Sequence, residues 1–472
     1  MADPLRPYTR PDTRPDAVYH CELAWLGGDV AEADVAIGVT GDRITSVAAG
    51  VGAPPGSQRL AGVTLPGLAN SHSHAFHRAL RGRTQVGTGS FWTWRQQMYA
   101  AAAGLDPDSY FQLARAVYGE MVLAGVTCVG EFHYLHHAPG GKPYTDANAM
   151  GVALIAAAAD AGLRITLLDT CYLRGGFDTG GAGGGAVELN AVQQRFTDGD
   201  ALSWATRASA LDATVSATSR IGAAAHSVRA VAPADIEVVA AWAASRQAPL
   251  HAHVSEQPAE NERCLDVLGL TPVQLLAERG ALGERFTAVH ATHLTDGDID
   301  LLGRSRCTAC FCPTTERDLA DGIGPALALR DAGAHLSLGS DSHAVIDLFE
   351  EARAVELNER LASLVRGSHD APSLLRAATV HGHSSLGWGD TGTIAVGALA
   401  DFVTVRLDTP RLAGTMRDHA LESVVFAGSA GDVTHVVVAG RVVVADARHR
   451  TIDVAAELDA AITGLVHAGM DG

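Results

Sequence analysis

The chain lacks an excess of positive charge. Its 472 residues include 35 lysines and arginines against 53 aspartates and glutamates, which gives a net charge of −18. Nucleic acids and anionic membranes attract basic surfaces, so we expect neither as a partner. If the substrate is a small anion, a few local arginines must bind it against this overall field.

Long apolar runs are also missing. No uninterrupted run reaches the length that spans a membrane, and residues 1–16, rich in proline, arginine and aspartate, lack the apolar core of a secretory signal. The seven cysteines are scattered and odd in number, which in a chain of this size predicts reduced thiols and a cytoplasmic location. The Cys307-x-x-Cys310-x-Cys312 cluster fits a buried strand better than a metal knuckle, because no second pair follows at zinc-finger spacing.

Hydrophobic residues make up 47% of the chain and charged residues 19%, so a sizeable core is possible. The length predicts one large domain with a small companion. Both ends are β-rich, with a hairpin pattern around Gly41-Asp42 and valine-rich runs near the other terminus. We therefore expect residues 1–64 and 392–472 to form one small β-sandwich with a terminal helix, and residues 65–391 to form the large domain.

The middle of the chain alternates short apolar strands with helical stretches. Eight strands separated by helices over about 330 residues predict an α/β fold, a parallel (β/α)8 barrel with insertions. An open doubly wound sheet is the rival fold, but no strand leads into a glycine-rich dinucleotide motif. The predicted strands begin at Leu65 and continue with 126–132, 163–169, 222–228, 249–254, 286–292, 308–313 and 335–341.

The first predicted barrel strand ends in His72-Ser73-His74. Strand side chains alternate between faces, so both imidazoles point to one side and can hold one cation. Further histidines and an aspartate stand where later strands end, and barrel enzymes carry their chemistry at that face. Each alone is more often an ordinary hydrogen-bonded side chain, so the shared position is the informative signal. These later residues are His226, His251, His253, His290, His293 and Asp341.

Glu256 lies three residues after His253, just beyond the fifth strand. A carboxylate there can move a proton between a water and a leaving group, or it can simply stand at the start of a helix. Imidazole and carboxylate ligands suit zinc but do not separate it from manganese or iron.

At these residues the chain resembles the amidohydrolase superfamily. The pattern of metal-site residues matches in order and in strand assignment, through His72, His74, His253, His290 and Asp341. No lysine ends the fourth strand, so the resemblance is to the mononuclear deaminases. It implies one zinc ion held by the first three of these histidines and the aspartate. It also implies that His290 and Asp341 align the attacking hydroxide and that Glu256 moves the protons.

A narrower resemblance rests on five segments, residues 70–79, 91–95, 131–134, 225–231 and 312–316. They are similar to the formimidoylglutamate deiminases of histidine degradation, and the likeness extends over nearly the whole chain. That family releases ammonia from N-formimidoyl-L-glutamate and leaves N-formyl-L-glutamate. The resemblance implies the same metal-dependent hydrolysis of an amidine C–N bond, with a small anionic substrate.

Two arginines could hold the carboxylates of such a substrate. Arg95 follows the aromatic run of 91–94 and is expected on a loop over the barrel mouth, and Arg229 follows the fourth strand. Guanidinium groups form forked hydrogen bonds with carboxylates. Arg95 could instead be a surface arginine beside core aromatics.

Three more side chains are expected at the substrate. Tyr134 follows the second strand and could donate its hydroxyl or merely cap the barrel, and His226 could hydrogen-bond substrate near the metal. His77 stands where the family usually has a glutamine that helps to hold the substrate. An imidazole can still donate a hydrogen bond, so we expect His77 to bind substrate as well.

Two other functions remain open. On the same metal site the chain could deaminate a heterocycle such as guanine, cytosine or an adenosine-like compound, which aromatic stacking without the arginine pair would favour. A catalytically silent scaffold of the same fold is the other alternative, and the intact ligand set with Glu256 argues against it. The family also suggests a homodimer.

Overall fold

Eight parallel strands pair in sequence order in the computed structural model, which describes residues 15–89, 91–177 and 187–466. A parallel bridge between Ser73, at the end of the first strand, and Asp341, beyond the last, brings the two sheet edges together. The predicted (β/α)8 barrel is therefore confirmed. Its strands are β5 Leu68–Ser73, β6 Val126–His133, β7 Arg164–Cys171, β8 Ser219–Ser227, β9 Leu250–Val254, β10 Phe286–His290, β11 Thr308–Phe311 and β12 His335–Leu338.

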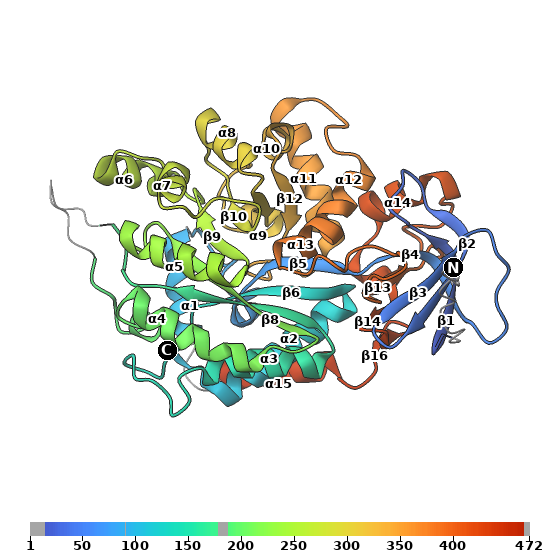
Figure 1. Ribbon diagram of the computed structural model, residues 1–472, viewed down its shortest axis with the longest axis horizontal. Coiled ribbons are helices and arrows are strands. Elements are labelled where there is room, and N and C mark those ends of the chain that lie inside the picture. The colour runs from blue at the N-terminus through green and yellow to red at the C-terminus, as the bar shows by residue number, and fades with distance from the viewer. Residues whose placement is uncertain (1–14, 90, 178–186, 467–472) are drawn as a thin grey trace, which may run out of the picture.

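Helices separate these strands and cover the outside of the barrel (Figure 1). Every residue of β6 and of β7 is buried, because one face of each strand meets the barrel interior and the other meets helices. The helices and short helical turns of this part are α1 Phe91–Ala103, α2 Pro107–Leu123, α3 Ala149–Ala161, α4 Ala201–Ala210, α5 Pro233–Arg246, α6 Pro258–Leu268, α7 Pro272–Glu278, α8 Asp296–Arg304, α9 Pro313–Asp318, α10 Ala326–Ala332, α11 Leu348–Ser363, α12 Ala371–Arg376, α13 Gly382–Ser385, η1 Ala75–Leu80, η2 Gln193–Arg195, η3 Leu211–Thr214 and the π-helical turn η4 Ala377–His381.

The first barrel strand begins later than predicted. Leu65 and Pro66 end a strand of the second sheet, β4 (Gln58–Pro66), and β5 begins only after Gly67. A Cβ atom on Gly67 would lie 2.2 Å from the Thr127 hydroxyl oxygen, so only glycine lets the chain pass from one sheet to the other here.

The two ends of the chain meet in a second sheet, as predicted. Its strand order is β16-β15-β14-β13-β4-β1-β2-β3, and it lies beside the barrel at one end of the molecule (Figure 1). The terminal helix α15 (Val454–Leu465) packs back against α2. Domain boundaries after residues 64 and 391 stay a prediction. The other elements are β1 Ala17–Ala24, β2 Glu32–Thr40, β3 Arg43–Ala48, β13 Phe402–Val405, β14 Val433–Val438, β15 Arg441–Ala445, β16 Arg448–His449, α14 Ala420–Ala427, η5 Arg417–His419 and η6 Ala430–Asp432.

The cysteines are buried, and the strand at the predicted cluster is shorter than expected. All seven are free thiols, and Cys310 lies in the buried strand β11, whereas Cys307 precedes this strand and Cys312 follows it. Across the described ranges, no helix combines the length and apolar character needed to cross a membrane.

A buried ion pair joins the barrel to the second sheet. Arg164, the first residue of β7, donates from Nε and Nη2 to the two carboxylate oxygens of Asp401, at 2.6 and 3.2 Å. Both side chains are fully buried, and Asp401 also accepts from the backbone N–H of Ala439 at 2.7 Å. Arg164 belongs to the barrel, and Asp401 comes from the part of the chain that forms the second sheet. The ion pair therefore fixes the orientation of the second sheet relative to the barrel.

Asp401→Ala should lower the free energy of unfolding by about 3–5 kcal/mol, because it leaves a buried guanidinium without its counter-charge. The midpoint of chemical denaturation measures this. Asp408→Ala is the matched control, since the Arg406–Asp408 pair has side chains 46% and 73% exposed. An exposed pair contributes about 0–1 kcal/mol, so equal shifts in the two variants would show that the buried pair does not stabilise the junction.

Candidate active site

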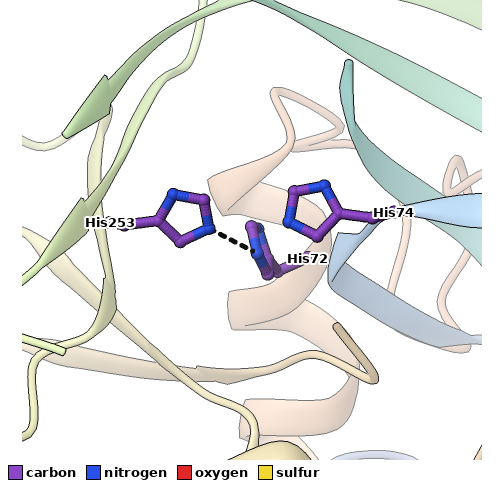
Figure 2. Close-up of side chains that lie close together, drawn as sticks. All are labelled: His72, His74 and His253. Atoms are coloured by element: carbon purple, nitrogen blue, oxygen red, sulfur yellow. Dashed lines mark hydrogen bonds between the residues drawn. The ribbon is translucent and has the colours of Figure 1, made fainter. Parts of the chain in front are cut away.

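Four side chains from three parts of the chain converge at the carboxyl ends of the barrel strands. His72 Nε2 lies 3.2 Å from His253 Nε2 and 3.3 Å from Asp341 Oδ1, and His74 Nε2 lies 3.4 Å from the same carboxylate oxygen. Figure 2 shows the three imidazole rings turned toward one another. All four residues are buried, with at most 6% of the surface exposed. The structure thus brings together the whole predicted ligand set.

The three separations given above suit ligands of one metal ion, and the ligand atoms of His72, His74 and His253 all lie within 4.8 Å of one another. Ligand atoms held about 2.0–2.1 Å from one zinc ion at tetrahedral angles are separated by roughly 3.3 Å. The Nδ1 atoms of His74 and His253 face the carbonyl oxygens of Phe132 and His226, at 3.0 and 2.9 Å. Donation from Nδ1 leaves the lone pair on Nε2, which is the tautomer that a metal requires. Burial lowers the pKa of both imidazoles well below its usual range, so both are neutral near pH 7.

The backbone around Asp341 is shaped for close approach. Asp341 has φ +43°, in the left-handed region, and its N–H donates to the carbonyl of His72 at 3.0 Å. A Cβ on Gly339 would lie 2.8 Å from Cβ of His72 and 2.9 Å from Sγ of Cys312, so a larger residue does not fit. Burial alone would raise the pKa of Asp341, but the hydrogen bond to His72 and electrostatic interactions with the imidazoles of His72, His290 and His74 hold it well below its usual range. The carboxylate is therefore ionised and available as a ligand.

His290 stands between carboxylates at the end of β10. Its Nδ1 lies 3.4 Å from Glu316, and its Nε2 lies 3.8 Å from both Glu256 Oε1 and Asp341 Oδ2. Nε2 is buried and has no hydrogen-bond partner among the described residues. Burial lowers the pKa of His290, but the Glu256, Glu316 and Asp341 charges outweigh it and raise the pKa well above its usual range. Gaps of 3.8 Å are too long for direct hydrogen bonds and are of the kind that a water can bridge.

The predicted substrate residues line one pocket above the ligand cluster. Arg95, Tyr134, His226, Arg229 and His77 all face it, together with His74, Glu256 and Asp341. His77 Nε2 lies 2.9 Å from the hydroxyl of Tyr134, and burial lowers the pKa of His77 to about 3, so the ring is neutral and can donate or accept.

The expectation that Arg95 lies on a loop is wrong. It lies in α1, because residues 91–103 contain no glycine or proline and end in four alanines, a strong helix former. Its Nη2 donates to the hydroxyl of Tyr172 at 3.0 Å, and its guanidinium lies 5.3 Å from the ring centre of Tyr99. The arginine still faces the pocket, now on a rigid element.

Arg229 has partners that the sequence did not indicate. Its Nη2 lies 3.5 Å from Glu256 and its Nε lies 3.7 Å from Glu260. Glu260 is buried, and burial raises its pKa to about 7. Arg229 therefore stands where it can hold both a substrate carboxylate and the orientation of Glu256.

Two strand-end histidines lie outside the cluster. His251 Nε2 lies 3.0 Å from the Ser385 carbonyl, and His293 Nε2 lies 2.7 Å from the Asp321 carbonyl, so both serve structural hydrogen bonds. Three residues near the site were not predicted from the sequence: Tyr172, Glu316 and Glu260. Tyr172 directly follows β7, so the strand-end rule could have found it, whereas the two glutamates lie in helices and carry no such signal.

A family model and related proteins match most of the chain. The family model described as the amidohydrolase family matches residues 63–443. The chain is 38% identical over 405 residues to a formimidoylglutamate deiminase of Pseudomonas aeruginosa, covering 84% of this chain and 87% of that protein. It is 28% identical to a 5-methylthioadenosine/S-adenosylhomocysteine deaminase of Natronomonas pharaonis, covering 84% of each.

Solved structures share the architecture. The crystal structure of an amidohydrolase from Brucella melitensis superimposes with a TM-score of 0.87 at 33% identity, over 96% of this chain and all (100%) of that one. An adenosine deaminase from Xanthomonas campestris with bound zinc gives a TM-score of 0.82 at 24% identity, over 96% and 98%. The second likeness concerns the fold alone.

His253→Ala should weaken zinc binding by more than the roughly 10–100-fold that the loss of an outer partner of a ligand costs, because it removes a donor atom. The zinc content after dialysis, measured by mass spectrometry, checks this. His251→Gln is the matched control on the same strand, since it keeps a donor for the Ser385 carbonyl and should retain the metal. Full turnover by thoroughly metal-free protein would contradict the assignment of a metal site.

Proposed function

The chain belongs to the amidohydrolase family, and we propose that it hydrolyses N-formimidoyl-L-glutamate to N-formyl-L-glutamate and ammonia with one zinc ion. The observation that carries the proposal is one pocket that holds the ligand cluster beside two arginines, Arg95 and Arg229. The relative that is 38% identical and named formimidoylglutamate deiminase supports the same substrate. The proposal includes a role in histidine degradation and a cytoplasmic location, which suits the seven unbonded cysteines.

His72, His74, His253 and Asp341 would hold the metal. A bound divalent ion activates water for attack near neutral pH by lowering the pKa of that water to about 7. The neutral imidazoles and ionised carboxylate described above are the protonation states that such an ion needs.

Glu256 and His290 would handle the attacking water and the protons. Glu256 takes one proton from the water as the formimino carbon becomes tetrahedral and delivers it to the imino nitrogen. It then moves the proton of the new hydroxyl to the same nitrogen, which leaves as ammonia as the C=O bond forms. His290 orients the attacking oxygen through Nε2, and Glu316 holds the ring from the Nδ1 side at 3.4 Å. The C=N double bond of the formimino group is replaced by a C=O double bond, both protons of the water end on the ammonia, and no redox partner is needed.

Arg95 and Arg229 would bind the glutamate end of the substrate. The chain carries a net charge of −18, so attraction for a dianion must come from these fixed guanidinium groups. Tyr134 and His77, which lie within hydrogen-bond distance of each other at 2.9 Å, and His226 offer further donors on the pocket wall.

A heterocycle deaminase is the competing function. Trp94, Tyr99, Tyr172 and Phe196 line the same pocket and could stack on a planar base. The two arginines favour the dicarboxylate, because a neutral base would leave their charges without a partner in the ligand.

Glu256→Gln should keep the metal and lower kcat by at least ~10², because the amide cannot accept the proton from water. Turnover and zinc content are measured on the same preparation. Glu284→Gln, at a side chain 73% exposed, is the control and should behave as the parent protein. If the Glu256 variant instead loses its metal but turns over normally per bound ion, Glu256 has a different role.

Arg95→Ala should lower kcat/KM for formimidoylglutamate by roughly one to two decades, the effect of losing a charged hydrogen-bond partner. Turnover of an N-alkylformamidine should change little, because that compound has no carboxylate. Arg229 is a poorer probe, since its removal also leaves Glu256 without its ion-pair partner.

The exposed Arg304→Ala variant controls for the lost charge. An equal fall for both substrates in Arg95→Ala would make this arginine structural. A parent enzyme that prefers guanine, cytosine or adenosine over formimidoylglutamate would overturn the proposed function itself.

A further inference from the structure

A second pocket lies at the opposite end of β12 from the metal-ligand cluster. β12 begins at His335, which lines this pocket, whereas Asp341 lies beyond its other end. The strand packs here against α10, α11 and η4. The labels of β12, α10, α11 and α12 lie in the same part of Figure 1. The pocket holds about 370 Å³ of free space, enough for a small organic molecule. It shares no residue with the active-site pocket.

The polar lining of this pocket is basic. None of the described residues that line it is a carboxylate, although acidic residues outnumber basic ones by 53 to 35 in the whole chain. The nearest carboxylates that act on its His369 are those of Glu356, Glu359 and Asp331, behind the lining. Such a local excess of cationic and neutral donors in an acidic protein favours an anion. The basic lining residues are Arg330, Arg376, His335, His369 and His381.

Two of these residues have polar atoms without a hydrogen-bond partner among the described residues. The guanidinium of Arg376, at the end of α12, makes no hydrogen bond with another described residue, and its charge acts on the nearby Asp370 carboxylate. The His369 side chain is buried, 2% exposed, and its Nε2 has no hydrogen-bond partner among residues whose positions are described. Arg330, by contrast, is bound to Asp331 at 2.7 Å. A buried polar atom without a partner is costly and points to a missing ligand or water.

The rest of the wall is apolar. Leu336, Leu338, Val355 and Leu374 face the same space and are each at most 7% exposed. One side of the pocket is a π-helical turn, η4, an element that is rare and frequent at functional sites. The wall therefore suits a molecule with a charged head and a short hydrocarbon part rather than a fully hydrated ion.

We propose that this pocket binds a small organic anion, a carboxylate whose head contacts Arg376 and His369 and whose short apolar chain packs on the leucines. Arg376 supplies the charge and a fork of donors. His369 supplies a donor from Nε2 that is otherwise unpaired. The site is independent of the proposed catalytic function, because it would bind its ligand whether or not the metal site is active.

Isothermal titration of the zinc-loaded enzyme with hexanoate tests this proposal, with inorganic phosphate as the second probe. We expect saturable hexanoate binding and much weaker phosphate binding. Arg376→Ala should weaken hexanoate binding roughly tenfold or more, as the loss of a charged hydrogen-bond partner does. The same variant should keep the parent turnover of formimidoylglutamate, which shows that it is folded.

Two further variants locate the ligand. Arg304→Ala makes the same change in charge at an exposed ion pair and should bind hexanoate as the parent does. Arg95→Ala should also keep hexanoate binding. Loss of binding in Arg95→Ala but not in Arg376→Ala would place the anion in the active site and overturn the proposal. Absence of saturable binding, or phosphate bound as tightly as hexanoate, would overturn it as well.

Discussion

The candidate active site depends on the closure of the barrel between its first and last strands. The Asp341 N–H donates to the His72 carbonyl at 3.0 Å, and the His74 N–H donates to the Asp341 carbonyl at 3.3 Å. These backbone bonds bring imidazole nitrogens and a carboxylate oxygen close together, an arrangement that suits a cation. The candidate metal site is thus a consequence of strand pairing, and the glycine at 339 is needed because the chain passes too close to His72 for any side chain.

Closure of the barrel also keeps three residues in an unfavourable backbone conformation. His290, Asp341 and His343 have φ values of +67°, +43° and +58°, and such conformations cost of the order of 1–3 kcal/mol each for non-glycine residues. The buried network below them offsets this cost: the Ser340 hydroxyl lies 2.9 Å from His343 Nδ1, and Asn70 donates to the same hydroxyl at 2.7 Å. On the other side of the barrel the Arg164–Asp401 pair fixes the second sheet in place. Side-chain contacts thus tie both ends of the barrel strands.

A small number of charged side chains determines the electrostatics of the barrel mouth. Glu256 stands 3.8 Å from His290 and 3.5 Å from Arg229, so one carboxylate lies between an imidazole and a guanidinium. A dianionic ligand would compete with Glu256 and Glu260 for Arg229. In the proposed function, binding of the glutamate end and the position of Glu256 would therefore be linked through Arg229.

Much of this was determined by the sequence alone. The eight strands, the meeting of the two chain ends, and the positions of His72, His74, His253 and Asp341 at strand ends follow from local apolar runs and from the two-residue alternation of strands, which are properties of neighbouring residues. The tertiary structure alone decided which strand-end histidines turn toward the metal site and which, like His251, turn to a distant carbonyl. It also decided the partners of Arg229, the helix that carries Arg95 and the basic pocket at the far end of β12. These features depend on distances between segments far apart in the chain, and such distances exist only once the barrel has closed.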